Sequence, residues 1–200
     1  LKQTARNTIE RGICAAFSPS GNLLAVGDSS STKVYSVSEQ GELTEEASLS
    51  ISPYALSFSQ DGKYLLAVGG FGGYISLYSV SGTTITLVQN GVAEISAAPN
   101  CCCSFDSSRF FVGGNGAGYS MLASSSSLTV LDSLTTGSAN ILSCTYGRNA
   151  LVFGTTDYLG KISFDSGGKF TAPSAISTGT AYNSVKFSAD GYLFCKRVSN

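Results

Sequence analysis

The 200-residue sequence predicts an all-β protein, because three of its features are typical of strands. Two stretches are nearly identical, ICAAFSPSGNLLAV at 13–26 and YALSFSQDGKYLLAV at 54–68, and each alternates apolar and polar residues before a turn that contains glycine. Glycine (23) and tyrosine (10) are abundant, and long runs of good helix formers at helical spacing are missing. The pattern recurs about every 42 residues with four short strands per unit, which is the spacing of a β-propeller blade. The predicted fold is therefore a β-propeller of four-stranded antiparallel blades.

The repeat is anchored on the residue that ends the first strand of each unit. These anchors are 41, 47, 40 and 42 residues apart: Phe17, Phe58, Phe105, Thr145 and Phe187. A polar turn and an apolar strand such as LLAVG follow each anchor, and four units continue into a third strand such as TKVYSV and a fourth such as TITLVQN. We expect Phe17 and Phe58 on the core-facing side of the innermost strand, where small Ala-Val-Gly segments let neighbouring blades approach closely.

The predicted blades form a single domain over 1–200. They are 12–52, 53–98, 99–139, 140–180 and a partial blade at 181–200, with 1–11 as the outer strand of a preceding blade. A ring of seven blades needs about 290 residues, so these roughly 4.5 blades predict part of a seven-bladed ring. The alternative is a five-bladed ring in which 4–10 joins the C-terminal hairpin. An open ring would expose strand edges and an apolar blade face, both of which need a cover.

The first two units resemble the WD40 repeat. FSPSGNLLAVGDSSSTKVYSV at 17–37 and FSQDGKYLLAVGGFGGYISLYSV at 58–80 are similar to the turn that joins the family's first two strands and to its short Asp/Gly turn into the third. The Trp-Asp pair of that family is replaced, for example by Tyr35-Ser36, and no Gly-His precedes the first strand. The resemblance implies a propeller that binds other proteins, without the Asp-His-Ser/Thr-Trp hydrogen-bond network of regular members.

The segment 34–70 also resembles the seven-bladed propellers of the 6-phosphogluconolactonase type. The matching residues are Gly41–Thr44, where a turn leads into a strand, and Asp61–Leu65, in the next turn. This second resemblance implies an alternative function, a lactonase that acts on a sugar lactone. It carries over no catalytic residue, because the chain has no matching His/Arg/Glu cluster.

The composition argues against nucleic acid and membrane as partners. The formal net charge is −1 and the isoelectric point is near 5.4, so the chain lacks the excess of positive charge that attracts the phosphates of a nucleic acid. No apolar run reaches the roughly 20 residues that span a bilayer, so membrane insertion is not expected. The polar stretch LKQTARNTIERG at the start of the sequence does not have the pattern of a signal peptide.

The six cysteines include three in succession, at 101–103. Adjacent side chains of a strand point to opposite faces, so these three cannot form a compact ladder of disulfides, and we expect buried free thiols. The chain has no Cys-x-x-Cys pair and no histidine, which excludes the common zinc sites built from them. This cysteine usage predicts a reducing, cytoplasmic location.

No set of residues predicts catalysis. Without histidine, neither a Ser-His-Asp triad nor a Cys-His dyad can form. Asp61 and Asp190 belong to Asp-Gly turns, and no run of alternating aspartates suggests a calcium loop. The glycine-rich pieces at 69–73 and 113–118 lack the Lys-Ser/Thr of a phosphate-binding loop and are expected to be turns. The sequence therefore predicts no catalytic residue, no metal site and no cofactor.

The candidate functional site is a protein-binding surface on the loops of the predicted propeller. In a propeller, the loops between the second and third strands share one rim with the links that enter each first strand, and exposed aromatic and arginine side chains are frequent anchors for protein partners. The candidate partner-binding residues on this rim are Arg11, Asp28, Tyr54, Phe71, Asn115, Asp157, Tyr158 and Tyr182. We expect a non-catalytic scaffold for protein–protein interaction. The alternatives are the lactonase and a propeller segment that completes another subunit in a larger assembly.

Overall fold

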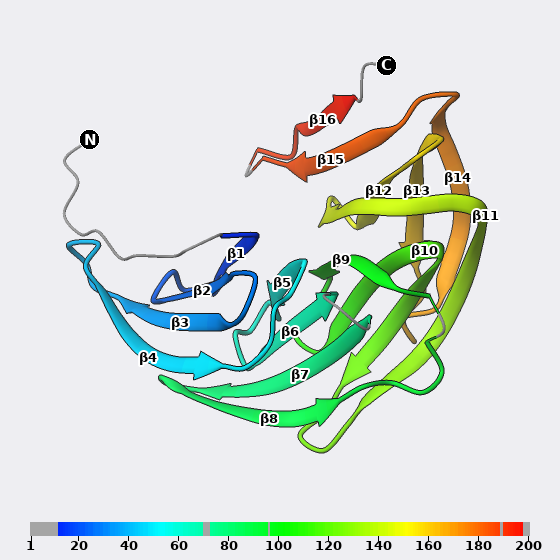
Figure 1. The fold of residues 1–200 in the computed structure, drawn as a ribbon. Coiled ribbons are helices and arrows are strands. Elements are labelled where there is room, and N and C mark those ends of the chain that lie inside the picture. The colour runs from blue at the N-terminus through cyan, green and yellow to red at the C-terminus, as the bar shows by residue number, and fades with distance from the viewer. Residues whose placement is uncertain (1–11, 70–72, 96, 189, 198–200) are drawn as a thin grey trace.

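The computed structural model describes residues 12–69, 73–95, 97–188 and 190–197. Within these ranges every regular element is a β-strand, and every pair of neighbouring strands is antiparallel. The sheets follow one another round an arc, with β1 at one end and the hairpin β15–β16 at the other (Figure 1). The predicted all-β fold with four-stranded antiparallel sheets is confirmed. The outer strand expected at 4–10 lies outside the described residues, and the number of blades in the ring stays a prediction.

Sheets 1 and 2 are simple four-stranded meanders, in which each strand pairs with the next one along the chain. Sheet 1 consists of β1 (Cys14–Phe17), β2 (Leu23–Gly27), β3 (Thr32–Val37) and β4 (Leu43–Leu49). Sheet 2 consists of β5 (Ala55–Phe58), β6 (Tyr64–Gly69), β7 (Tyr74–Ser81) and β8 (Thr84–Asn90). In both, the first strand is innermost in the arc and the last is outermost (Figure 1).

The next six strands are joined in one continuous hydrogen-bonded sheet. They are β9 (Pro99–Ser104), β10 (Arg109–Ala123), β11 (Leu128–Gly147), β12 (Ala150–Thr155), β13 (Tyr158–Phe164) and β14 (Phe170–Thr178). The last hairpin, sheet 5, is formed by β15 (Tyr182–Phe187) and β16 (Leu193–Arg197).

Two long strands of the continuous sheet each supply two blade strands. The amide of Ala123 donates to the carbonyl of Ser108 (2.7 Å), so the two ends of β10 meet, and Gly116 takes a positive φ of 73° between its arms. The first arm of β11 pairs with β10, and its second arm pairs with β12. We call β9, β10 and the first arm of β11 sheet 3, and the second arm of β11 with β12–β14 sheet 4.

The turn after the innermost strand is built in the same way in sheets 1, 2 and 5. A serine hydroxyl accepts the amide N–H at or next to the start of the following strand, and a glycine three residues after the serine has a positive φ. The serines are Ser18, Ser59 and Ser188, and the glycines are Gly21, Gly62 and Gly191. Left-handed backbone favours glycine and a serine hydroxyl can replace a lost backbone acceptor, so the repeated Phe-Ser-x-x-Gly of the sequence specifies this turn.

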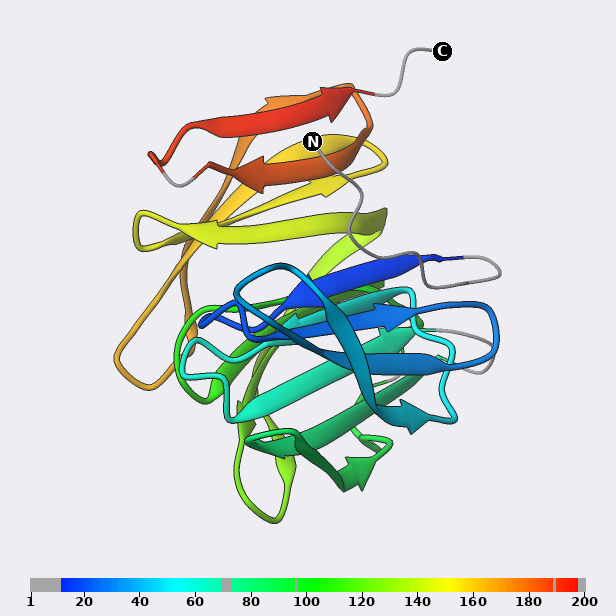
Figure 2. The ribbon, with the colours of Figure 1, turned by 90° about the vertical axis from the view of Figure 1, so that its left-hand side faces the viewer.

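Each inner sheet buries one face against the preceding sheet and the other against the following one, and Figure 2 shows the sheets as successive layers. In β6, Leu65 and Ala67 pack toward sheet 1, whereas Leu66 and Val68 pack toward sheet 3. All four side chains are fully buried. Successive side chains of a strand point to opposite faces, so an uninterrupted apolar run is what a strand buried on both sides requires.

Aromatic rings fill the interface between sheets 3 and 4. Phe110 packs toward sheet 2, but the next residue, Phe111, packs toward sheet 4, where its ring lies 6.2 Å from that of Phe153. Phe105 stacks on Phe164 with ring centroids 3.9 Å apart and planes 10° apart. Such pairs add about 0.5–1.5 kcal/mol each to the burial of their surfaces, so this interface is a firmly packed part of the fold.

The two phenylalanines that were expected in the core differ in how much of their side chains is exposed. Phe58 is 5% exposed and packs against sheet 1, as predicted, but Phe17 is 61% exposed and its prediction was wrong. Phe58 is buried by the sheet that precedes its own. Among the described residues no sheet precedes sheet 1, so the equivalent position at Phe17 is left open.

Replacing Phe111 by alanine should lower the free energy of unfolding by about 3–5 kcal/mol, because the ring is fully buried between two sheets. The matched change Phe194→Ala should cost less than about 1 kcal/mol, because that ring is 63% exposed. Urea unfolding followed by circular dichroism measures both values. Equal losses for the two variants would contradict the stacking described here.

Candidate partner-binding rim

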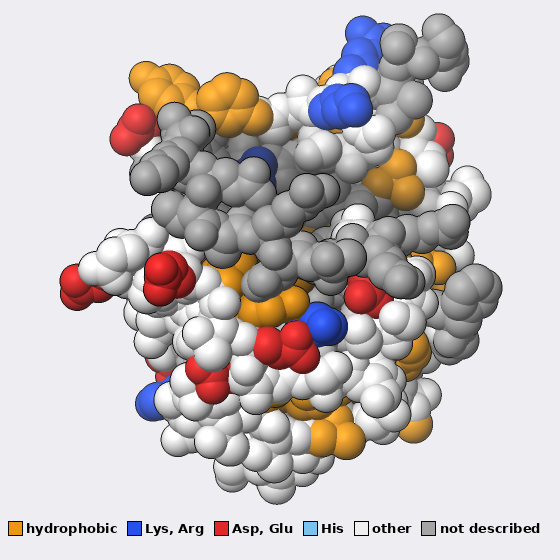
Figure 3. Space-filling view, turned by 60° about the vertical axis from the view of Figure 1, so that its left-hand side comes forward, with side chains coloured by type: hydrophobic (Ala, Val, Ile, Leu, Met, Phe, Trp, Pro, Cys, Tyr) orange, Lys and Arg blue, Asp and Glu red, His pale blue; other side chains and the backbone are white. Residues whose placement is uncertain are grey.

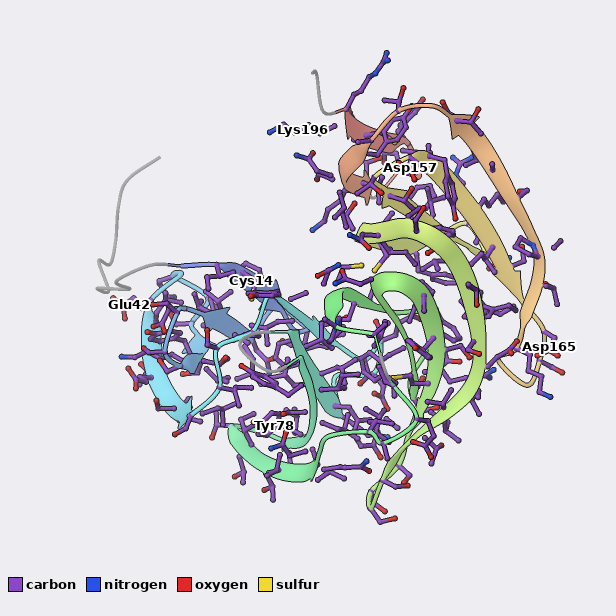
Figure 4. All side chains as sticks on the ribbon, turned by 45° about the vertical axis from the view of Figure 1, so that its right-hand side comes forward. Cys14, Glu42, Tyr78, Asp157, Asp165 and Lys196 are labelled. Atoms are coloured by element: carbon purple, nitrogen blue, oxygen red, sulfur yellow. The ribbon has the colours of Figure 1, made fainter. Side chains whose placement is uncertain are left out.

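The rim lies where the turns between second and third strands meet the segments that enter the inner strands. Backbone N–H···O=C bonds join the two kinds of segment: Tyr54 to Val68 (2.8 Å), Asn115 to Ala98 (3.1 Å) and Thr156 to Asn140 (3.0 Å). Because β13 runs between them, Asp157 and Asp165 lie at opposite ends of sheet 4, with Asp157 at the rim (Figure 4). The described loop residues chosen from the sequence therefore belong to one end of the inner strands.

Asp28 stabilises the loop between β2 and β3 by accepting hydrogen bonds within it. Its side chain is buried, and one carboxylate oxygen accepts the backbone N–H groups of Ser30 and Ser31 (both 2.7 Å) and the Ser30 hydroxyl (2.9 Å). These backbone hydrogen bonds, chiefly that from Ser30, hold the pKa of Asp28 below its ordinary value in spite of its burial. The carboxylate is thus used inside the loop and is not presented on the surface of the rim.

Tyr54 and Asn115 are exposed on the rim. Tyr54 is 46% exposed, and its ring lies so close to Gly69 that a Cβ at that glycine would be 2.7 Å from it. The Asn115 side-chain oxygen accepts a hydrogen bond from the Asn100 amide (3.1 Å), which also donates to the carbonyl of Ile141 in the next sheet (3.1 Å). Both residues therefore have a fixed position and a free surface.

Asp157 and Tyr182 lie where sheets 4 and 5 meet, whereas the Tyr158 ring packs on the other face of sheet 4, toward sheet 3. Asp157 is exposed, and its carbonyl accepts the N–H of Thr180, which leads into β15 (3.0 Å). Tyr158 is half-buried, and its burial raises the pKa of its phenol. The Tyr182 hydroxyl donates to the Ser177 hydroxyl oxygen (3.2 Å), while its ring packs with the apolar residues between the two sheets.

The remaining predicted rim residues, Arg11 and Phe71, lie outside the described part of the chain. The sequence did not point to two further polar groups on this rim, Asn100 and Tyr74. The Tyr74 hydroxyl accepts the backbone N–H of Ser52 (2.6 Å) and so ties sheet 2 to the segment entering it. Both residues occur within strand patterns, where alternation alone does not reveal a bridging role.

The exposed groups of the described rim residues are few in kind. They are tyrosine rings, a side-chain amide and the carboxylate of Asp157, while the Asp28 carboxylate is bound within its own loop. Among the described residues, no group of three or more His, Cys, Asp or Glu side chains could hold a metal ion. The part of the chain that the structure describes also contains no helix that is long and apolar enough to cross a membrane.

Away from the rim, the side of the molecule that carries sheet 1 is acidic (Figure 3). Its exposed carboxylates are Glu39, Glu42, Glu45 and Glu46. Lys33 pairs with Glu45 (3.0 Å), and both side chains are part-exposed, so this ion pair contributes little to stability.

The comparisons with known proteins bear on the fold. No protein-family model and no curated protein matches the sequence. The solved structures that resemble it include hydrazine synthase of Kuenenia stuttgartiensis, with 14% identity and a TM-score of 0.70 over 98% of this chain and 59% of that one. The β-propeller domain of Cps50 (Swd1) from Myceliophteria thermophila has 15% identity and a TM-score of 0.72, covering 97% of this chain and 64% of that one.

A third similar structure is a Bacteroides uniformis protein assigned as a 6-phosphogluconolactonase. It has 15% identity and a TM-score of 0.73, covering 90% of this chain and 62% of that one. This chain thus spans about three fifths of the length of the three proteins. Likeness at such low identity establishes the fold alone, and that fold is a β-propeller, similar both to a Swd1 propeller and to a lactonase-like one.

Replacing Asp28 by alanine should lower the free energy of unfolding at pH 7 by about 1–3 kcal/mol, because two backbone N–H groups lose a charged acceptor. The folded-state pKa is lowered, so this contribution is complete above the unfolded value of about 3.9 and is lost as the pH falls through the lower folded value. Urea unfolding at pH 7 and pH 2.5 measures the difference from wild type. A loss that is the same at both pH values, or one matched by Asp157→Ala, would contradict this role.

Proposed function

We propose that the chain is a non-catalytic scaffold that binds another protein through the rim. The observation that carries this proposal is Tyr54, a large aromatic side chain 46% exposed and held in place against Gly69. Tyrosine is frequent among residues that dominate binding energy, because it buries much apolar surface and keeps a polar tip. Exposed Asn115 and Asp157 add polar groups in the neighbouring sheets of the same rim, and polar groups commonly accompany such an aromatic residue in a protein interface.

The half-buried rim tyrosines support the same proposal. Tyr158 lies edge-on to Phe153 with ring centroids 6.0 Å apart, and the Tyr182 hydroxyl is held by Ser177. A partner that contacts them loses little side-chain freedom on binding, because the rings are already fixed. Propellers share one fold across many functions, so the proposal rests on this rim and not on the similar structures.

A lactonase is the second candidate. It is favoured by the likeness to the Bacteroides uniformis protein over 90% of this chain and by the Gly41–Thr44 and Asp61–Leu65 matches. In this chain Asp61 accepts hydrogen bonds from Ser59 and from the Lys63 amide, so its carboxylate serves a turn. We expect no hydrolysis of 6-phosphoglucono-lactone above the spontaneous rate in a pH-stat assay. A clear rate enhancement by the purified chain would show that it is an enzyme and would contradict the scaffold proposal.

A propeller segment that completes another subunit is the third candidate. It is favoured by the exposed rings of Phe17 and Phe194, which lie on the strands at the two ends of the arc (Figure 1). Such a partner would cover these end faces, whereas a partner of the scaffold would cover the rim. The positions of contact therefore separate the two proposals.

Photo-crosslinking can test the rim directly. A photoreactive phenylalanine analogue placed at Tyr54 should crosslink a partner protein in cells, while the same group at Tyr192, a tyrosine 70% exposed in the turn after the innermost strand of sheet 5, should not. Crosslinks to the same protein from Tyr192, or from Phe17 and not from Tyr54, would contradict the rim as the binding surface.

The partner found in this way allows a quantitative check. The double change Tyr54→Ala and Asp157→Ala should weaken its binding at least about 30-fold, as expected when an aromatic anchor is lost. Tyr192→Ala should leave binding within about threefold of wild type, because an exposed side chain outside the interface contributes little. Isothermal titration of the partner with each variant gives the two values.

A further inference from the structure

Three cysteine side chains from two sheets lie together beside the inner strands of sheets 3 and 4. Cys101 and Cys103 alternate along β9, so both belong to its face toward sheet 4, while Cys102 belongs to the face toward sheet 2. Cys144, in the second arm of β11, packs in the same cluster as Cys101 and Cys103. All three side chains therefore lie in the interface between sheets 3 and 4.

The backbone explains why Cys103 and Cys144 meet. Near the start of β9, the side-chain amide of Asn100 donates to the carbonyl of Ile141 at the start of the second arm of β11 (3.1 Å). Both inner strands leave the rim in the same direction, so three residues further along they reach Cys103 and Cys144. A register shift between Ile141 and Ser143 then turns the Cys144 side chain toward sheet 3, because a bulge re-aims the residues that follow it.

Of the three thiols, those of Cys103 and Cys144 are the pair that a small reagent can reach. Cys101 is buried, and its sulfur donates to the carbonyl of Gly113 (3.8 Å). Cys103 and Cys144 both retain partial exposure, so a small reagent can reach them. Burial raises the pKa of the Cys144 thiol well above its ordinary value, which slows its own attack on an oxidant. In the reaction proposed below, Cys103 reacts first and Cys144 second.

We propose that Cys103 and Cys144 are a redox-modification site, at which a low-molecular-weight disulfide such as oxidised glutathione converts them into a disulfide that links sheets 3 and 4. The Cys103 thiolate attacks one sulfur of oxidised glutathione, a mixed disulfide forms, and one glutathione leaves as a thiolate that takes up a proton. Cys144 gives up its proton to solvent, attacks the Cys103 sulfur and displaces the second glutathione. The cysteine pair loses two electrons, and oxidised glutathione is reduced to two molecules of glutathione.

The bond would join two inner strands that otherwise contact each other through side chains. A disulfide between residues far apart in the sequence restricts the unfolded chain, so oxidation should raise Tm by roughly 5–10 °C. The link lies a few residues from the rim, three positions beyond Asn100 in β9 and Ile141 in β11. Oxidation would therefore also fix the spacing of sheets 3 and 4 beneath the proposed partner-binding surface.

Peptide mass spectrometry tests the site. The purified chain is equilibrated with mixtures of oxidised and reduced glutathione, free thiols are blocked with N-ethylmaleimide, and the digest is searched for linked peptides. We expect one disulfide, between the 101–103 peptide and the Cys144 peptide, in wild type and in the matched variant Cys102→Ser. We expect it to be absent in Cys144→Ser and at least tenfold less abundant in Cys103→Ser.

Three outcomes would overturn the proposal. These are no disulfide under the most oxidising mixture, a yield in Cys103→Ser equal to that of wild type, and an equal yield in 8 M urea, where the folded geometry is lost. Cys14 provides an internal reference, because it is half-buried like Cys103 and Cys144, but its thiol donates to the carbonyl of Pro53 (3.6 Å) and its burial raises its pKa to about 11. We expect Cys14 to remain unmodified throughout.

Discussion

Burial of both faces of each sheet against its neighbours is the interaction on which the rest of the structure depends. A single twisted four-stranded sheet cannot hide two apolar faces, but sheets stacked round an axis can. The alternation in β6, with Leu65 toward one neighbour and Leu66 toward the other, is repeated at Phe110 and Phe111 in β10. At about 25 cal/mol per Å² of apolar surface, these interfaces supply most of the energy that holds the sheets together.

The same stacking positions the candidate sites. Because every sheet presents its first strand to the axis, the loops that enter these strands meet at one rim, where Tyr54, Asn115 and Asp157 are exposed. Because neighbouring inner strands lie side by side, two cysteines that are far apart in the sequence, Cys103 and Cys144, lie in the same interface between sheets 3 and 4. The binding surface and the thiol pair are both consequences of the way the blades pack.

The repeat in the sequence was sufficient to predict most of the strands, the serine–glycine turns and the burial of Phe58, because these depend on local pattern and spacing, but the piece 113–118, expected to be a turn, lies within β10. Contacts between sheets were harder to predict. Phe105 falls at the same repeat position as Phe58, yet it packs toward the following sheet and not the preceding one, because a shift of one residue in a strand exchanges its faces. Asp28 was predicted to lie on the rim surface, but its carboxylate accepts hydrogen bonds from the backbone of its own loop. Residue type alone does not predict the geometry of such a loop.

The packing of one sheet on the next is tested most directly by a double-mutant cycle across sheets 3 and 4. Phe105 and Phe164 stack with ring centroids 3.9 Å apart, although 59 positions separate them in the chain (164 − 105). Unfolding of Phe105→Ala, Phe164→Ala and the double variant should give a coupling energy of about 0.5–3 kcal/mol, as found for residues in contact. Losses that add to within about 0.3 kcal/mol would contradict the account, because they would mean that the two sheets do not share a core.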